Sequence, residues 1–309
     1  MDNRLLQISF KDALSALADL LMPRVCLVCG RPLTLRERFM CLPCSFDLPL
    51  THYERWEHNP MADKYNLRIE ECRRCPQEWE TSSENGVFLQ EMSQKMGHLR
   101  QSEEKYEPYQ RAAALFFYRR GSGYDNITQE LKYHANFAAG RYFAAMLGRR
   151  LRESPLFVDV DLVVPVPLHW TRRARRGYNQ AEIVAGEVAR VLSIPLAPRL
   201  LRRVRRTRTQ TRTADRFANI SGAFAVRSVH TWSDLRPGMC KKGQKRSYLA
   251  SFFARYARRT VFDANQVRHI LLIDDVFTTG ATLTACHEAL RQVFGPEVRI
   301  SVATLAFAE

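Results

Sequence analysis

The chain has 309 residues, of which 46% are hydrophobic, which is enough for a core in one large or two modest domains. Its formal net charge of +15 favours anionic partners, namely nucleic acid, phosphate-rich ligands or a membrane surface. The sequence has no apolar run of about 18 residues and no N-terminal signal sequence, so we expect no membrane span and a cytoplasmic location.

The first predicted element is an amphipathic helix over residues 5–21, which ends before Pro23. We expect it to dock on the body of the protein rather than to anchor it in a membrane. Residues 80–107 are polar with weak periodicity, which indicates a linker or a peripheral insertion. The predicted parts are a helix and cysteine-rich module at 1–78, a linker or insertion at 79–108, and a second domain at 109–309.

Two Cys-x-x-Cys pairs follow the first helix, Cys26 with Cys29 and Cys41 with Cys44. Each pair can chelate a metal from a tight turn, and two pairs complete a tetrahedral thiolate site. In the cytosol, cysteines are expected to be reduced or metal-bound rather than disulfide-bonded. The spacing therefore predicts a structural Zn²⁺ site in a zinc-ribbon-like module, with reduced cysteines or a redox pair as the alternatives.

A third pair, Cys72 and Cys75, lacks a following glycine and has no partner pair. The sequence leaves three roles open for it. It binds a second metal with outside help, it replaces one of the first pairs, or it binds nothing.

From residue 109 onward, segments with strand character alternate with segments of helical spacing. This alternation predicts an α/β domain with a parallel sheet covered on both faces. A long, basic and irregular stretch near 227–266 indicates an insertion into that domain. The predicted strands are 112–118, 158–166, 222–226, 270–273 and 298–307, and the predicted helices include 125–151 and 180–192.

The loop after the strand at 158–166 presents His169 and four arginines, among them Arg172 and Arg176. Guanidinium groups match the oxygens of a pyrophosphate bidentately, and the helix that begins near Gln180 adds a positive dipole end. The loop is therefore a candidate pyrophosphate site. A solvated basic turn is the alternative interpretation.

Arginine remains frequent further along the chain: residues 171–212 contain twelve arginines and two acidic residues. The run at 201–219 has little apolar content, which suggests a mobile loop that could act as a lid. It could equally be a contact strip for nucleic acid. The sequence does not separate these two roles, and the polar residues in question are Arg206, Gln210, Arg216 and Asn219.

The apolar run at 270–273 ends on two adjacent acidic residues, Asp274 and Asp275. In an open parallel sheet, ligands lie beyond the carboxyl ends of the strands. Two neighbouring carboxylates repel each other unless a cation or sugar hydroxyls use them. A buried strand before a threonine-capped helix would explain the apolar run and the threonines, but it would not explain the acidic pair.

The turn that follows the acidic pair offers hydroxyl groups and a glycine next to a helix N-terminus, a combination that favours a phosphate dianion. It is not a nucleotide-triphosphate loop, because no Gly-Lys-Ser/Thr follows. The predicted phosphate-binding residues are Thr278, Thr279, Gly280, Ala281 and Thr282.

Residues 270–283 resemble the signature of type I phosphoribosyltransferases, which bind phosphoribosyl diphosphate (PRPP). The resemblance implies a phosphoribosyltransferase-like fold in which the threonine loop binds the 5-phosphate and the acidic pair faces the ribose 2- and 3-hydroxyls. It also implies that Mg²⁺ bridges the pyrophosphate and the ribose. Lys132, His169, Arg172 and Arg176 would then bind the pyrophosphate.

The order of the motifs resembles the ComF family, which combines an N-terminal zinc module with a PRPP-type domain. The matching segments are 131–133, 165–169, 176–180, 206–210 and 216–219. The resemblance covers nearly the whole chain outside 80–107 and 227–266. It implies a role in DNA uptake during natural competence, with single-stranded DNA and components of the uptake machinery as partners.

Two functions remain open at the level of sequence. In the first, the acidic pair and threonine loop support phosphoribosyl transfer, with Mg²⁺ and the basic residues stabilising the departing pyrophosphate. In the second, the protein binds single-stranded DNA and retains the PRPP site as a sensor or a remnant. No residue identifies the attacking nucleophile, so the sequence assigns no acceptor substrate, and it does not reveal the oligomeric state.

Overall fold

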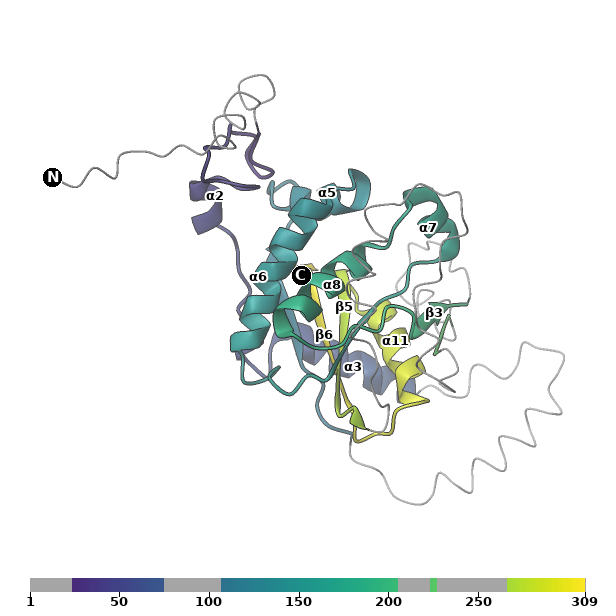
Figure 1. Cartoon of the computed structure of the whole chain (residues 1–309). Helices are drawn as coiled ribbons and strands as arrows, with labels where there is room; N and C mark the ends of the chain where they lie inside the picture. Colours follow the sequence, from purple (N-terminus) through teal and green to yellow (C-terminus); the bar gives the residue numbers. More distant parts are fainter. Residues whose placement is uncertain (1–23, 75–106, 205–222, 227–265, 309) are drawn as a thin grey trace, which may run out of the picture.

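The computed structural model describes residues 24–74, 107–204, 223–226 and 266–308 (Figure 1). The predicted helix at 5–21, Cys75, most of the predicted linker and insertion, and the four polar residues of the 201–219 run lie outside these residues. The helices are α2 (Leu42–Phe46), the 3₁₀ helix η1 (Tyr53–Arg55), α3 (Pro60–Arg74), α5 (Asp125–Tyr133), α6 (Phe137–Glu153), α7 (Trp170–Arg176), α8 (Gln180–Leu192) and α11 (Ala281–Arg291). The strands are β1 (Ala112–Tyr118), β2 (Leu162–Pro165), β3 (Leu201–Arg203), β4 (Phe224–Val226), β5 (His269–Phe277) and β6 (Arg299–Ala308).

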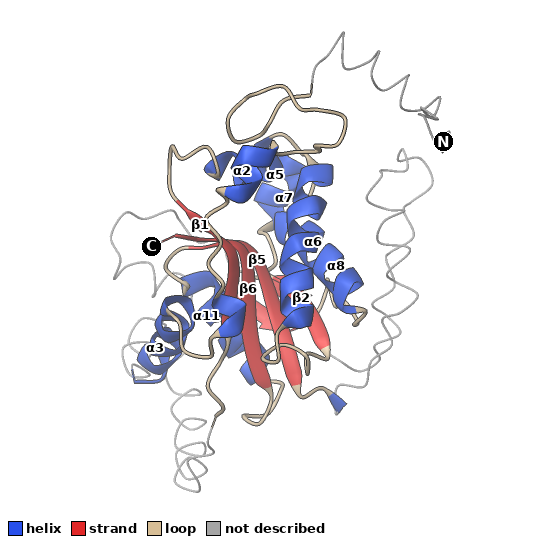
Figure 2. Ribbon diagram, turned by 90° about the vertical axis from the view of Figure 1, so that its left-hand side faces the viewer, coloured by secondary structure: helices blue, strands red, loops and turns tan. Residues whose placement is uncertain are grey.

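Four strands form a parallel sheet in the order β1-β6-β5-β2. Helices cover both faces, with α6 and α8 on one and α3 and α11 on the other (Figure 2). This arrangement confirms the predicted α/β class with its parallel sheet. The two short strands β3 and β4 pair antiparallel in a separate sheet, so the segment predicted at 222–226 does not extend the main one.

The alternation of side chains along β5 explains why its sequence is a continuous apolar run. Ile270 and Leu272 pack in the core that α11 covers, where Leu290 is also buried. Leu271 and Ile273 pack in the core on the other face, with Val184 of α8. Since both faces of the strand are buried, each position of the run needs an apolar side chain.

Both edges of the sheet are covered by irregular chain. Next to β1, the Phe117 N–H donates to the Pro49 carbonyl at 2.8 Å, and the Thr51 N–H donates to the Leu115 carbonyl at 3.2 Å. Next to β2, the Val163 N–H donates to the Pro195 carbonyl at 2.9 Å. These bonds occupy backbone groups that an open edge would leave for pairing with another chain.

The helix predicted over 125–151 is two helices, α5 and α6. Ala135 has a left-handed backbone with φ of 58° short of none of the usual helical range, at +53°, so it cannot continue α5. Asn136 then caps α6, because its side chain accepts the Ala139 N–H at 3.1 Å. The break places Lys132 near the end of α5, beside the carboxyl end of the sheet.

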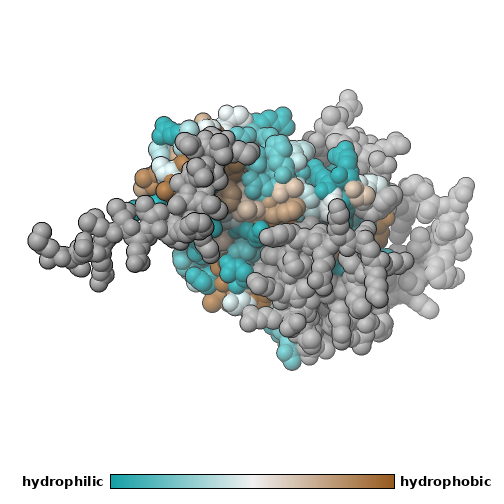
Figure 3. Space-filling model, turned by 45° about the horizontal axis from the view of Figure 1, so that its top comes forward, coloured by the Kyte–Doolittle hydropathy of each residue, from teal (hydrophilic) through white to brown (hydrophobic). Residues whose placement is uncertain are grey.

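None of the described helices is both long enough and apolar enough to cross a bilayer. On the face shown in Figure 3, hydrophilic residues surround a smaller apolar area within the described surface. The predicted absence of a membrane span therefore holds for this part of the chain.

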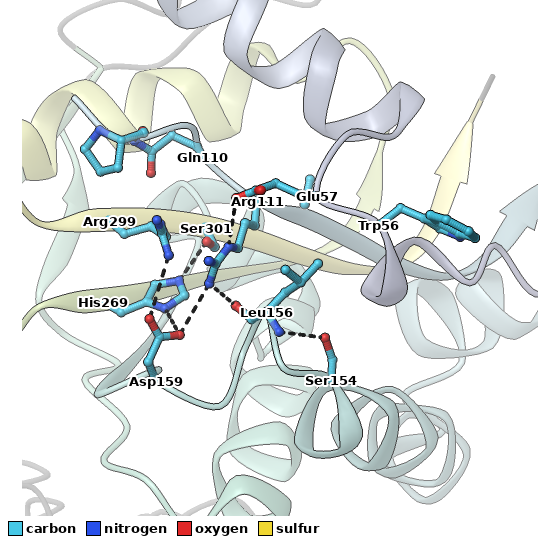
Figure 4. Close-up of polar contacts among 12 residues, drawn as sticks. Trp56, Glu57, Gln110, Arg111, Ser154, Leu156, Asp159, His269, Arg299 and Ser301 are labelled. Carbon is cyan, nitrogen blue, oxygen red and sulfur yellow. Dashed lines mark hydrogen bonds and ion pairs between the residues drawn. The ribbon is translucent and has the colours of Figure 1, made fainter. Parts of the chain in front are cut away.

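A buried polar cluster joins the amino ends of β5 and β6 to the loop after α6 (Figure 4). Nδ1 of His269 lies 2.8 Å from Oδ1 of Asp159, and its Nε2 lies 2.7 Å from Oγ of Ser301. Arg111 and Arg299 add ion pairs to Asp159 at 3.5 and 3.7 Å. The contact order is that of a Ser-His-Asp triad, but Ser301 is 0% exposed, so no substrate reaches its hydroxyl. The cluster is structural.

Acid should destabilise the protein through His269. Burial lowers the pKa of His269 from 6.5 to about 4, although Asp159 opposes the shift. Between these two values the unfolded state binds a proton that the folded state does not, so stability falls as the pH falls. His269→Asn should therefore lose less stability than the wild type between pH 6.5 and pH 4.5 in urea unfolding. The exposed His58→Asn serves as control, and equal losses in His269→Asn and wild type would contradict this role.

Candidate functional site

The acidic pair lies inside β5 rather than after it, where β5 still pairs with β6. The Asp275 N–H donates to Oδ1 of Asp274 at 2.9 Å, and Oδ2 of Asp275 lies 3.1 Å from Nζ of Lys132. Burial and the adjacent charge of Asp275 raise the pKa of Asp274 to about 8, although Lys132 and Arg203 oppose the shift. Near neutral pH, Asp274 therefore holds a proton that a cation or another positive group would displace.

The threonine loop connects the acidic pair to α11 through residues 276–280. Gly280 has φ of +77°, and a Cβ atom there would lie 2.8 Å from Cζ of Phe277. Only glycine fits this position, because a side chain would combine backbone strain with a clash against a buried ring. Thr278 is exposed and Thr279 is partly exposed, so their hydroxyl groups lie at the surface next to the start of α11.

The basic loop predicted after β2 is largely a helix, α7. Nδ1 of His169 accepts the Thr171 N–H at 3.3 Å and caps the helix, and Gly177 ends it with φ of +79°. Two of its arginines have protein partners: Arg173 binds Glu182 through two contacts at 2.8 and 3.3 Å, and Arg176 lies over the Tyr133 ring at 5.5 Å. Prediction of a loop failed because one residue at each end, not an apolar stripe, defines this short helix.

Contacts between α5 and the segment after α7 bring the predicted basic residues together. The Tyr178 hydroxyl donates to the Leu131 carbonyl at 2.6 Å, and Asn179 donates to the Val166 carbonyl at 2.9 Å. Tyr178 and Asn179 therefore hold the helices in place rather than contact a ligand. Through these bonds, Lys132 and Arg176 lie at the end of the sheet that carries the acidic pair.

Arg203 on β3 is a candidate site residue that the sequence did not single out. Its guanidinium lies over the Phe224 ring at 5.3 Å. Burial lowers its pKa, and the charges of Arg172 and Asp274 act on it in opposite directions, so it lies between α7 and the acidic pair. No local pattern distinguishes Arg203 from the other arginines of 201–219. Only the pairing of β3 with β4 places it here.

The four predicted metal ligands come together. The Sγ atoms of Cys26, Cys29, Cys41 and Cys44 all lie within 4.8 Å of one another, and those of Cys29 and Cys41 are 3.6 Å apart. Tetrahedral thiolates with Zn–S bonds of about 2.3 Å would be about 3.8 Å apart, so the cluster fits a zinc ion. Four thiolates leave no open coordination position, so the metal would be structural.

The local backbone favours thiolates at this centre. The Gly30 N–H donates to the Cys26 carbonyl at 2.9 Å in a tight turn, and the Cys41 N–H points at the Cys26 sulfur at 3.4 Å. Burial raises the pKa of Cys26, but backbone N–H groups outweigh it and bring the value to about 7. Cys72 lies on α3, outside the cluster, while Cys75 lies beyond the described residues.

The cysteine module packs directly on the helix that carries Lys132. Asn126 donates to the Leu27 carbonyl at 3.0 Å, and the Tyr124 hydroxyl donates to the Cys44 carbonyl at 3.1 Å. A Cβ atom at Gly123 would lie 2.5 Å from the Val28 carbonyl oxygen, so the two segments touch through a glycine. A metal at the cysteine cluster would therefore support the position of α5.

No family model matches the chain. The chain is similar to Competence protein F of Haemophilus influenzae, with 27% identity over 181 residues. The match covers 56% of this chain and 64% of that protein, so the chain spans less than two thirds of the length of this relative. Together with the order of its motifs, this similarity supports membership of the ComF family.

Proposed function

We propose that the protein acts in DNA uptake during natural competence and binds PRPP with Mg²⁺ at the acidic pair. The name of the similar Haemophilus protein supports the competence role. The contact between Lys132 and Asp275, at the end of β5 and next to the threonine loop, carries the ligand assignment. It joins a cationic side chain, two carboxylates and a phosphate-sized turn in one place.

Each part of the site would meet a different part of PRPP. The loop from Thr278 to Thr282 and the start of α11 would bind the 5-phosphate, because N–H groups at a helix start attract anions. Asp274 and Asp275 would orient the ribose hydroxyls. Arg172, Arg176 and Lys132 would bind the pyrophosphate, as would His169, whose Nδ1 also caps α7.

Mg²⁺ suits this site because it prefers carboxylate and phosphate oxygens, and it would neutralise charge on the pyrophosphate. The residues of the chain would supply the rest. The acidic pair would hold the ribose while positive charge grows at its anomeric carbon, and the basic side chains would stabilise the departing group. The proposal assigns no acceptor.

Lys132→Ala should weaken PRPP binding by roughly tenfold, which corresponds to about 1.4 kcal/mol. The substitution removes the cation that faces Asp275 and a predicted contact to the pyrophosphate. Lys64→Ala, on α3 across the sheet, is the matched control and should bind PRPP like the wild type. Equal affinities for Lys132→Ala and the control would remove Lys132 from the site.

Turnover separates phosphoribosyl transfer from a sensor role. In the transferase, PRPP would release pyrophosphate when a suitable base or amine is present, and the double variant Asp274→Asn with Asp275→Asn would abolish the release. In the sensor, PRPP would bind but stay intact with every acceptor. Measurement of pyrophosphate release over a panel of bases and amines decides between the two.

A further inference from the structure

A hollow of about 510 Å³ lies between the cysteine module and the outer surface of α6 and α8. The module contributes Arg38 and Phe39, α6 contributes Arg141, Tyr142 and Arg149, and α8 contributes Arg190. A second hollow of about 450 Å³ shares Arg149 and continues past Arg150. We call the two hollows together the α6 groove. None of the residues predicted for the PRPP site lines it.

The charge of the first hollow is strongly positive. Four arginines line it, against one acidic residue, Glu187. Arg190 already holds Glu187, with contacts of 2.9 and 2.5 Å to Oε1. Within the described part of the chain, Arg38 and Arg149 have no acidic partner. The wall therefore presents guanidinium groups that are available to an anionic ligand.

The arginines are spaced along a line rather than gathered at a point. Arg141 and Arg149 are eight residues apart on one helix, which is about 12 Å at the rise of an α-helix. Arg150 continues the line into the second hollow, although Glu54 pairs with it at 2.8 Å. A single phosphate would meet only one or two of these groups, whereas a polymer with regularly spaced charges would meet them all.

An aromatic pair lies in the same wall. The rings of Phe39 and Tyr142 are 5.4 Å apart and tilted by 58°, and both side chains are partly exposed. Aromatic side chains beside a positive groove stack the bases of single-stranded nucleic acids. An anionic membrane surface would use the charges but would not need a concave wall with exposed ring faces.

We infer that the α6 groove binds single-stranded nucleic acid, with the arginines on the phosphates and Phe39 and Tyr142 beside the bases. This inference deepens the proposed handling of single-stranded DNA and does not depend on PRPP binding. It also gives the cysteine module a task, because that module supplies one wall of the groove. Loss of the metal should therefore weaken binding of the strand.

The test is fluorescence anisotropy of a labelled oligothymidylate with the zinc-loaded full chain over a series of salt concentrations. The variant Arg38→Ala with Arg149→Ala should bind at least tenfold more weakly, and its salt dependence should fall by one to two phosphate contacts, roughly 1 in slope for each. The control, Arg120→Ala with Arg152→Ala, removes the same charge from exposed positions outside the groove. It should bind within about twofold of the wild type. Melting temperature and zinc content confirm that both variants fold.

Equal losses in the groove variant and the control would overturn the inference, since net charge alone would then explain binding. Tyr142→Leu should also weaken binding, and an unchanged affinity would remove the stacking role. Binding of phosphatidylserine vesicles that depends on Arg38 and Arg149, without binding of the oligonucleotide, would contradict the inference in favour of a membrane. PRPP binding measured on the groove variant should be normal, so failure here is distinguishable from failure of the PRPP site.

Discussion

Asp274→Asn should stabilise the protein at alkaline pH while it removes PRPP binding. The pKa of the Asp274 carboxyl is about 8 in the folded protein, against 3.8 as its ordinary value. Between these values the folded state holds a proton that the unfolded state has lost, so stability falls as the pH rises from about 4 to about 8. Asparagine does not titrate, and the variant escapes this loss.

The gain in melting temperature should be small at pH 5 and largest at pH 8.5, as measured by thermal unfolding at both values. Asp275→Asn is the comparison, because removal of the neighbouring charge lowers the pKa of Asp274 and should give a gain in the same direction. A gain in Asp274→Asn that is independent of pH, or a loss at pH 8.5, would contradict the raised pKa. A buried acid retained against stability is typical of a site kept for binding.

Removal of zinc should unfold the cysteine module and lower the melting temperature by at least about 5 °C. Cys26 and Cys41 are 2% and 1% exposed and belong to the same core as Phe143 of α6. Loss of a structural zinc site costs several kcal/mol, and each kcal/mol corresponds to roughly 2–4 °C in a domain of this size.

The purified protein should contain one zinc ion per cysteine cluster. A chelator should release it and expose four reactive thiols, which a thiol reagent counts. Cys44→Ser should lose the metal, whereas Cys72→Ser, outside the cluster, should keep it. A melting temperature that does not respond to the chelator would contradict a structural metal. Release of zinc from Cys72→Ser alone would assign the third pair a metal instead.

Local patterns were enough to predict those features that depend on neighbouring residues. The run at 270–273 predicted a strand because both of its faces are buried, and the cysteine spacing predicted a cluster because each pair closes its own turn. The α7 helix was missed because His169 and Gly177 define it from its two ends. Long-range contacts were not predictable: the His269 cluster joins residues 110 positions apart, and Arg203 reaches the acidic pair only through the folded sheet.

The same distinction applies to the candidate site. Asp274, Asp275 and the threonine loop adjoin one another in sequence, so the pattern identified them together. The contact of Lys132 with Asp275 spans most of the second domain, and the order of motifs suggested it only through the family resemblance. The α6 groove combines three distant segments, none of which has a motif of its own.

Calorimetric titration of PRPP with Mg²⁺ into the zinc-loaded protein tests the central claim most directly. One molecule of PRPP should bind per chain, and the double variant Asp274→Asn with Asp275→Asn should abolish the signal while remaining folded. No heat of binding to the wild-type protein, or equal binding to the double variant, would show that the acidic pair is not a PRPP site.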